Sequence, residues 1–381
     1  MTDEAFWKEL TIGDLGKVVT GKTPPTSNSE YFGGDIPFVT PTDMDGRRVI
    51  STTERYLTEK GAEAVKGSKL PARSVMVSCI GSQMGKVAIS GKPCVTNQQI
   101  NSIIVSPEYS ELFVYYSLSL RGDEIRYIGS GSAVPILNKS DFSNLPILVH
   151  PLPEQRAIAG ILGALDDKIE LNRRMNRTLE SMARAVFAEM MKDEGGRMKV
   201  GTVGEDFHLT MGQSPPGETY NEESEGMPFF QGRADFGFRY PVNRVYCIAP
   251  TRFAKAGDTL VSVRAPVGDV NMAKEKCAIG RGVAAVRHKT GSRSYTYYAM
   301  KFLEEDFARF EAEGTVFGSI NKADFQNLEI GIPTTEQVEQ FEKTYYPIDQ
   351  MIENNEKESR MLASLRDTLL PKLMRGEVRV K

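Results

Sequence analysis

The sequence predicts a mixed α/β or α+β protein with two pseudo-symmetric globular domains, joined by two long antiparallel helices that form a coiled coil. Three observations predict this fold class. A set of short motifs occurs twice, each copy contains apolar runs broken by Gly and Pro, and each copy closes with a long helical pattern. At 381 residues the chain is long enough for two such domains.

The repeated motifs keep the same order in both halves of the chain. GKTPP at 21–25 returns as GQSPP at 212–216, and NKSDFSNL at 138–145 returns as NKADFQNL at 321–328. The displacement stays between 182 and 191 residues. A period this long indicates duplicated domains rather than a solenoid of small repeats.

Each copy begins as a globular domain and ends as a helix. Apolar runs such as SVMVSCIG and TLVSVRAP alternate with turns and a few helix-like segments, and the motifs PLPEQ and PTTEQ then introduce helical periodicity. We expect a first domain over 1–152, a helix over 153–195, a second domain over 196–332 and a second helix over 333–381.

Both helices carry a heptad seam, with residues of the seam at steps of 3 and 4. The first seam comprises Ile158, Leu162, Leu165, Ile169, Asn172, Asn176, Leu179, Ala183, Val186 and Met190. The second comprises Phe341, Tyr345, Ile348, Ile352, Asn355, Ser359, Leu362, Leu369 and Leu373. We expect the helices to pack on each other. Asn172 and Asn355 would then fix the register as a buried polar pair, or else lie at a solvated edge.

The charge distribution indicates two separate basic regions. The net charge of -3 argues against a protein that coats nucleic acid by charge alone. Residues 51–100 nevertheless carry roughly +4 and residues 251–300 roughly +6. These windows occupy comparable places in the two copies and suggest two binding sites.

The cysteines, histidines and apolar runs exclude other classes. The four cysteines are scattered through β-like apolar runs, where buried free thiols are expected, and the three histidines are isolated. We therefore expect neither a zinc site nor a histidine-based hydrolytic triad. No apolar run is long enough to span a membrane and no signal peptide is apparent, so we expect a cytoplasmic protein without a membrane anchor.

GKVVTGKT at 16–23 fits the phosphate-loop pattern G-x-x-x-x-G-K-[ST], but its surroundings do not. A working loop leads directly into a helix, whereas Thr23 is followed by two prolines, and the second copy has Gln213 in place of Lys22. We interpret the segment as an apolar run that enters a G-x-[ST]-P-P turn. IAGILGALDD, which ends at Asp167, belongs to the helix, and GSGSAV at 129–134 lacks the context of a dinucleotide fingerprint.

The ordered motifs resemble those of the specificity (S) subunits of type I restriction–modification enzymes over essentially the whole chain. The resemblance rests on GKTP followed by YFGGDIPFV at 31–39, GKVA at 85–88, GSGS at 129–132, PLPEQ before the first helix and LLPKLMRG at 369–376. Each motif alone is weak, but the duplicated and ordered set is specific.

The resemblance implies two target-recognition domains, each reading one half of a bipartite site in double-stranded DNA. It implies that the helices space these domains and dock two methyltransferase subunits, with restriction or translocase subunits as further partners. The chain itself would be no enzyme and hold no cofactor, while its partners would use S-adenosylmethionine, and ATP with magnesium. Because the two copies differ, the half-sites should differ. The rival hypotheses are a nucleotide-binding enzyme that relies on Lys22 and a coiled-coil scaffold without DNA binding.

Residue chemistry, rather than the resemblance, selects the candidate DNA-binding residues. Arg reads guanine, Asn and Gln read adenine, and Lys and Arg bind phosphates. The candidates lie in Gly-rich turns or at the ends of apolar runs: Lys22, Arg47, Arg48, Gln83, Lys86, Asn97, Gln98, Gln99, Arg233, Arg239, Arg264, Asn271, Arg281, Asn321 and Lys322. The alternative for each is a solvated side chain, and for Asn321 and Lys322, as for Asn138 and Lys139, a helix cap.

The apolar faces of the two helices look broader than their own pairing requires. We expect them to bind methyltransferase helices, as in helix-in-groove recognition. The candidates for this contact are Ile158, Leu162, Leu165, Ile169, Met175, Leu179, Met182, Phe187, Ile348, Ile352, Leu362 and Leu369. The alternative is ordinary packing against the adjacent domain.

Overall fold

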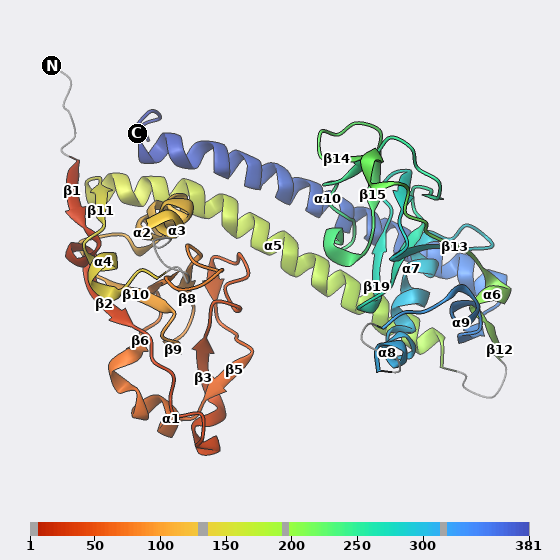
Figure 1. The fold of residues 1–381 in the computed structure, drawn as a ribbon, viewed down its shortest axis with the longest axis horizontal. Helices are drawn as coiled ribbons and strands as arrows, with labels where there is room; N and C mark the ends of the chain where they lie inside the picture. The colour runs from red at the N-terminus through yellow and green to blue at the C-terminus, as the bar shows by residue number, and fades with distance from the viewer. Residues whose placement is uncertain (1–6, 129–135, 193–197, 313–317, 381) are drawn as a thin grey trace. The chain divides into compact units, whose positions relative to one another are not determined.

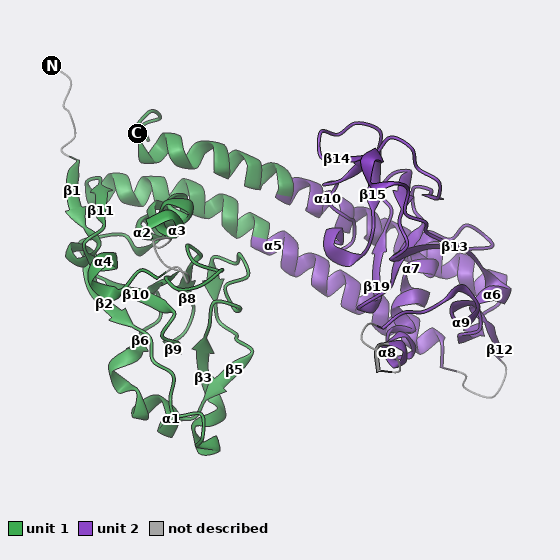
Figure 2. Cartoon of the chain, viewed as in Figure 1, with its two compact units in different colours: residues 1–169, 360–381 green, residues 170–359 purple. Residues whose placement is uncertain are grey.

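The structure is a computed structural model and describes residues 7–128, 136–192, 198–312 and 318–380. The chain divides into two compact units (Figure 2). Unit 1 comprises Met1–Ile169 and Arg360–Lys381, and unit 2 comprises Glu170–Ser359. Both units combine sheets with helices, so the predicted mixed fold class is confirmed (Figure 1).

Unit 1 is built mainly from short strands, because Gly- and Pro-rich turns interrupt the apolar runs. Its strands are β1 (Lys8–Thr11), β2 (Gly16–Thr20), β3 (Phe32–Val39), β4 (Val49–Ile50), β5 (Arg55–Leu57), β6 (Lys69–Leu70), β7 (Val75–Ser78), β8 (Val87–Ser90), β9 (Cys94–Thr96), β10 (Ile100–Val105) and β11 (Pro146–Val149). β1 pairs with β11, and the two larger sheets have the orders β2-β10-β7-β8-β4 and β5-β3-β9-β6. Its short helices are α1 (Glu59–Ala64), α2 (Glu111–Leu120), α3 (Gly122–Ile128) and α4 (Lys139–Ser143), with 3-10 turns η1 (Ile12–Leu15), η2 (Ser29–Tyr31) and η3 (Lys66–Ser68).

Unit 2 has the same kinds of elements. Its strands are β12 (Lys199–Thr202), β13 (Phe207–Met211), β14 (Tyr220–Asn221), β15 (Met227–Phe230), β16 (Tyr246–Cys247), β17 (Phe253–Ala254), β18 (Thr259–Val263), β19 (Val267–Met272), β20 (Cys277–Ile279), β21 (Val283–His288) and β22 (Glu329–Ile332). β12 pairs with β22, and the larger sheets have the orders β13-β21-β18-β19 and β14-β16-β15-β20-β17. Its short helices are α6 (Val203–Asp206), α7 (Arg293–Phe302), α8 (Glu304–Ala312) and α9 (Lys322–Gln326), with 3-10 turns η5 (Gly217–Thr219) and η6 (Arg233–Asp235).

The two units repeat one topology. The strand order β2-β10-β7-β8 corresponds to β13-β21-β18-β19, and β5-β3-β9-β6 corresponds to β16-β15-β20-β17. The terminal pair β1-β11 corresponds to β12-β22. The duplication predicted from the repeated motifs is therefore confirmed, with β4 added in unit 1 and β14 added in unit 2.

The repeated NK-x-DF motif begins a short helix in each unit. The side chain of Asn138 accepts a hydrogen bond from the amide of Asp141 at the start of α4, and that of Asn321 accepts one from the amide of Asp324 at the start of α9. Asn is favoured at this position because its oxygen satisfies an unpaired helix amide. The Nδ2 group of Asn321 also donates to Asp324 Oδ2 at 2.6 Å. The helix-cap interpretation is confirmed for Asn138 and Asn321. Asn321 stays exposed, and its binding to DNA remains a prediction.

The core of each unit lies between its sheets and its helices. In unit 1, Val75 and Ile103 of the sheet pack with Val114 of α2, and in unit 2, Val261 and Val286 pack with residues of α7.

All four cysteines are buried free thiols, as predicted. Burial raises the pKa of the Cys79 thiol to about 11 and the pKa values of Cys94 and Cys277 to about 12. Among the described helices, none combines the length and apolarity that a bilayer crossing requires.

The two long helices are α5 (Leu152–Met190) and α10 (Thr335–Met374), and each contributes to both units. In unit 1, Ile158 and Leu162 of α5 pack with Leu370 and Leu373 of α10. In unit 2, Phe187 of α5 packs with two aromatic residues near the start of α10, Phe341 and Tyr345. Early residues of one helix meet late residues of the other, so the predicted antiparallel pairing is confirmed. The expected domain boundary between 195 and 196 lies outside the described residues.

Polar residues occupy the centre of the α5–α10 seam within unit 2. Asn172 is fully buried and its Nδ2 donates to Glu358 Oε2 at 2.8 Å, while Asn355 Nδ2 donates to Asn176 Oδ1 at 2.8 Å. Asn172 is therefore buried as predicted, but it meets Asn355 only at the backbone carbonyl, at 3.4 Å, and the half-buried side chain of Asn355 binds Asn176 instead. Elsewhere the seam departs from the strict heptad: Phe187 is buried in place of Val186, which is 47% exposed. A straight α-helix repeats every 3.6 residues rather than 3.5, so a buried face drifts away from heptad positions along 39 residues.

Candidate nucleic-acid interface

The first candidate surface is an edge of unit 1 where two parallel strands end. β3 and β9 pair in parallel with Val39 opposite Thr96, so their carboxyl ends meet at the same edge. The amide of Asn97 donates to the carbonyl of Val39 at 3.0 Å, which holds the following loops, residues 40–42 and 97–99, together. We call this place the first edge.

The G-x-[ST]-P-P turn packs against the first edge. The amide of Lys22 donates to the carbonyl of Thr96 at 2.9 Å, and a Cβ atom on Gly21 would lie only 2.0 Å from the carbonyl oxygen of Asn97. Gly21 is therefore required by the close approach of two backbones, not by a bound phosphate. β2 ends at Thr20 and no helix follows the turn, so the rejection of the phosphate loop is confirmed, while Lys22 remains exposed at this edge.

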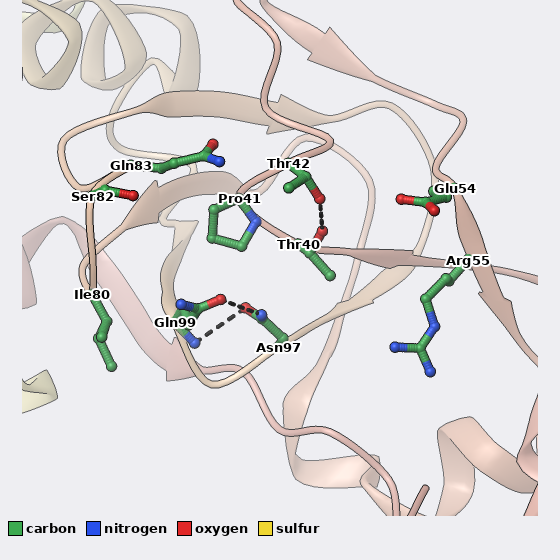
Figure 3. Close-up of a pocket in the computed structure, with 10 residues that line it drawn as sticks. All are labelled: Thr40, Pro41, Thr42, Glu54, Arg55, Ile80, Ser82, Gln83, Asn97 and Gln99. Atoms are coloured by element: carbon green, nitrogen blue, oxygen red, sulfur yellow. Dashed lines mark hydrogen bonds between the residues drawn. The ribbon is translucent and has the colours of Figure 1, made fainter. Parts of the chain in front are cut away.

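A polar pocket of about 410 Å³ opens at the first edge (Figure 3). It is lined by Thr40, Pro41, Thr42, Glu54, Arg55, Ile80, Ser82, Gln83, Asn97 and Gln99. Asn97 Nδ2 donates to Gln99 Oε1 at 2.8 Å, and the Gln99 amide donates to Asn97 Oδ1 at 3.1 Å. Lys86 Nζ donates to Gln83 Oε1 at 2.6 Å. Three predicted amide side chains thus converge on one pocket, with a lysine that orients one of them.

Unit 2 has an equivalent place, which we call the second edge. β15 and β20 also pair in parallel, with Phe230 opposite Ile279, and the amide of Gly280 donates to the carbonyl of Phe230 at 2.8 Å. A Cβ atom on Gly212 would lie 2.1 Å from the carbonyl oxygen of Gly280, so the second GQSPP turn needs glycine for the same reason. The loops at the second edge are residues 231–233 and 280–282.

Three exposed arginines follow three strands at the second edge. Arg233 follows β15, Arg281 follows β20, and Arg264 follows β18, where the amide of Val263 donates to the carbonyl of Gly282 at 2.9 Å. Arg233 Nη1 forms an ion pair of 2.9 Å with Asp269 Oδ2. The second edge therefore carries several arginines, whereas the first edge carries the pocket with three amide side chains.

Two of the predicted DNA-binding residues are buried and a third is half-buried, and all three bind their own unit, so those predictions are wrong. Arg239 is fully buried and forms an ion pair with Asp349, and Asn271 is fully buried and donates to the carbonyl of Gly237 at 2.9 Å. Arg48 donates to the carbonyl of Gly163 in α5 at 3.2 Å and forms an ion pair with Asp167. Although burial disfavours the charge of Arg48, hydrogen bonds and Coulombic interactions with Tyr116 and Asp167 raise its pKa above the ordinary value.

The remaining predicted residues lie at or near the surface. Gln98 is exposed beside the pocket and accepts a hydrogen bond from Thr23 Oγ1 at 2.6 Å. Arg47 is bound to Asp45 through Nε at 2.9 Å, outside the pocket lining, and Lys322 is exposed at the first turn of α9. Sequence reasoning missed the pocket residues 40–42, which follow β3, and residues 54–55 at the start of β5, because the strand pairing that assembles them was not available from the sequence.

Family comparison agrees with the duplicated topology. A family model described as the type I restriction modification DNA specificity domain matches the chain twice, over residues 5–181 and 199–360. The chain belongs to this family. It is a type I restriction–modification DNA-specificity protein with two recognition domains.

Relatives of this specificity protein match over most of its length. Two proteins of Methanocaldococcus jannaschii are 28% and 26% identical, each across 98% of this chain and 94% of its own length, and the second is the type I restriction enzyme MjaIX specificity subunit. The HindI specificity subunit of Haemophilus influenzae is 39% identical over 37% of this chain and 31% of its own length. The crystal structure of a type I restriction–modification S subunit from M. genitalium has a TM-score of 0.62 at 19% identity, covering 98% of this chain and 97% of that chain, and shows the same fold.

The specificity protein also presents an apolar stripe on α5 within unit 2. Leu171, Met175, Met182 and Val186 are 53%, 36%, 58% and 47% exposed, and their spacing of 4, 7 and 4 residues places them on one face of the helix. We call these four residues the α5 stripe. The sequence predicted Met175 and Met182 as partner contacts but missed Leu171 and Val186, which the spacing could have revealed.

Several predicted partner contacts in this specificity protein are instead buried within its own units, and those predictions are wrong. The buried residues are at most 5% exposed: Ile158, Leu162, Ile169, Phe187 and Ile352. They lie between α5 and α10 or against the adjacent domain. This is the alternative to partner binding, ordinary packing within the chain. The other predicted contacts are half-buried: Leu165, Leu179, Ile348, Leu362 and Leu369.

Proposed function

We propose that each unit reads one half of an asymmetric bipartite DNA site, so that the chain sets the specificity of a type I restriction–modification complex. The observation that supports this proposal is the pair of equivalent edges with different chemistry. The first edge carries a pocket lined by amides, and the second carries three exposed arginines. Side chains of these types discriminate base pairs in the major groove. Two domains that share a fold but carry different side chains at their edges would bind two different half-sites.

We further propose that methyltransferase subunits bind the α5 stripe. An apolar stripe on a helix fits an amphipathic partner helix, and its methionines adapt to irregular surfaces. On this proposal the chain supplies recognition without catalysis and holds no cofactor. The methyltransferase subunits use S-adenosylmethionine, and restriction or translocase subunits, where present, use ATP with magnesium.

The rival functions have less support. A nucleotide-binding enzyme would need a helix after GKVVTGKT, and this segment enters a turn against the first edge instead. A scaffold without DNA binding would leave the equivalent polar edges of the two units without a role. The DNA-reading function accounts for both edges.

Substituting Arg264 with alanine tests the assignment of DNA reading to the edges. We expect Arg264→Ala to weaken specific DNA binding by roughly 1–3 kcal/mol and to relax base preference in one half-site, because an exposed arginine at the second edge can reach a base or a phosphate. Binding and selection on randomised duplex DNA measure both effects. Arg309→Ala is the matched control, because Arg309 is an exposed arginine of α8 in the same unit that pairs with Asp306. Unchanged preference in both half-sites would refute this role for Arg264.

A further inference from the structure

The two edges can be compared position by position, because their backbone hydrogen bonds are equivalent. The amide of Cys79 donates to the carbonyl of Gln99 at 2.7 Å, as the amide of Val263 donates to that of Gly282 at 2.9 Å. Ile80 therefore occupies the place of Arg264. By the same comparison, residues 97–99 (NQQ) match 280–282 (GRG), and Thr42 matches Arg233. Every arginine of the second edge replaces an uncharged residue of the first.

The hydrogen bonds within the first edge leave free the donor and acceptor groups of Gln83 and Gln99 that an adenine base needs. Gln83 Oε1 accepts from Lys86 Nζ, and Gln99 Oε1 accepts from Asn97 Nδ2. Each of these two oxygens can accept a second hydrogen bond. Neither Nε2 group has a partner in the described part of the chain, so both keep their donor hydrogens free. A glutamine amide that donates through nitrogen and accepts through oxygen matches N7 and N6 of adenine. Lys86 and Asn97 therefore hold the two glutamine side chains in place, and each side chain can still donate and accept a hydrogen bond.

The second edge carries arginines at the positions that match Thr42, Ile80 and Gln98 of the first edge. A guanidinium group only donates hydrogen bonds, and its planar fork matches the O6 and N7 acceptors of guanine. Asp269 holds the guanidinium of Arg233 by an ion pair of 2.9 Å, and both residues remain partly exposed. At the matching positions unit 1 has Lys86 in place of Asp269 and Thr42 in place of Arg233, so the first position has the opposite charge in the two units and the second is charged only in unit 2.

We propose that the first edge reads an adenine through Gln83 and Gln99, and that the second edge reads a guanine through Arg264 and Arg281. This inference rests on the proposed function and adds the base class that each half of the site must contain. It predicts an A·T pair as the position most sensitive to unit 1 and a G·C pair as the position most sensitive to unit 2. Arg233, oriented by Asp269, supports the second edge as a further donor.

The test is selection on randomised duplex DNA by the full chain, purified with the methyltransferase subunit encoded next to it. We expect the double variant Gln83→Ala, Gln99→Ala to lose preference for one A·T pair by roughly five- to 150-fold, with the other half-site unchanged. We expect Arg264→Ala with Arg281→Ala to lose preference for a G·C pair in the other half only. Lys92→Ala is the control for the first edge, because Lys92 is an exposed residue of the same unit that follows β8 at the end opposite Lys86 and does not line the pocket.

A conservative variant separates base reading from damage to the fold. Gln83→Glu keeps the size of the side chain but removes the donor, so preference should move from adenine toward cytosine, whose N4 group donates to a carboxylate. If the wild-type complex selects a bipartite motif and these variants select the same motif unchanged, the inference is wrong and the proposed function stands. If the wild-type complex selects no motif, the proposed function itself is wrong.

Discussion

Asp349→Ala is expected to destabilise unit 2 by about 3–5 kcal/mol, because it leaves a buried arginine without its counter-ion. Arg239 is fully buried, and its guanidinium forms an ion pair with Asp349 and donates to the Tyr298 hydroxyl at 3.0 Å. It also stacks on the Tyr297 ring, 3.9 Å from the centroid. Without the carboxylate these neutral contacts cannot replace the lost hydration of a cation.

Chemical unfolding of the wild type and of two variants measures this effect. The matched control is Asp306→Ala, which removes the partner of Arg309 in an exposed ion pair of 3.1 Å in the same unit. Exposed pairs contribute about 0–1 kcal/mol, so the control should unfold close to the wild type. An Asp349→Ala variant that is as stable as Asp306→Ala would show that Arg239 finds water or another acceptor.

Met175→Glu combined with Met182→Glu is expected to abolish methyltransferase binding while the chain stays folded. Both side chains belong to the α5 stripe and are 36% and 58% exposed, so a charge is tolerated in the free protein. In a complex the two carboxylates would be buried without partners, which costs several kcal/mol and lowers affinity by about 100-fold or more. Co-purification and analytical ultracentrifugation with the methyltransferase subunit measure the loss.

The control for this experiment is the neighbouring substitution Ser181→Glu. Ser181 is exposed on α5 but lies off the stripe, so the same charge is added without entering the contact. If Ser181→Glu weakens binding as much as the double methionine variant does, general repulsion explains the effect. If the double methionine variant binds as the wild type does, the α5 stripe is not the docking surface.

The features that the sequence predicts well depend on patterns that are local or repeated. The duplication, the G-x-[ST]-P-P turns and the two long helices were all predictable, because each leaves a motif or a periodicity in neighbouring residues. The register of the seam was predicted less well, since Val186 follows the heptad but Phe187 is the residue that packs on Phe341. A seam position is decided by the partner helix as well as by the spacing.

The parts of the site that the sequence could not predict depend on contacts between distant segments. Nothing in the neighbouring sequence distinguishes Arg239 from Arg264 as a DNA-binding candidate. Arg239 is buried because it pairs with Asp349, which lies 110 residues away in the sequence. The pocket at the first edge depends on the parallel pairing of β3 with β9, which brings Asn97 and Gln99 together with residues 40–42. The loop that carries Gln83 joins them because the amide of Cys79 donates to the carbonyl of Gln99 at 2.7 Å. Strand order is a property of the whole domain, so residue type alone selected exposed residues at the edges and buried residues such as Arg239 alike.

The central claim is that this chain sets a DNA specificity composed of two different halves. Mapping methylated bases across the genome of host cells, with and without the gene for this chain, tests it most directly. We expect a methylated motif of two unlike blocks separated by unspecified bases, present only when the gene is intact. Identical methylation in both strains, or a gene-dependent motif whose two halves are the same, would contradict it.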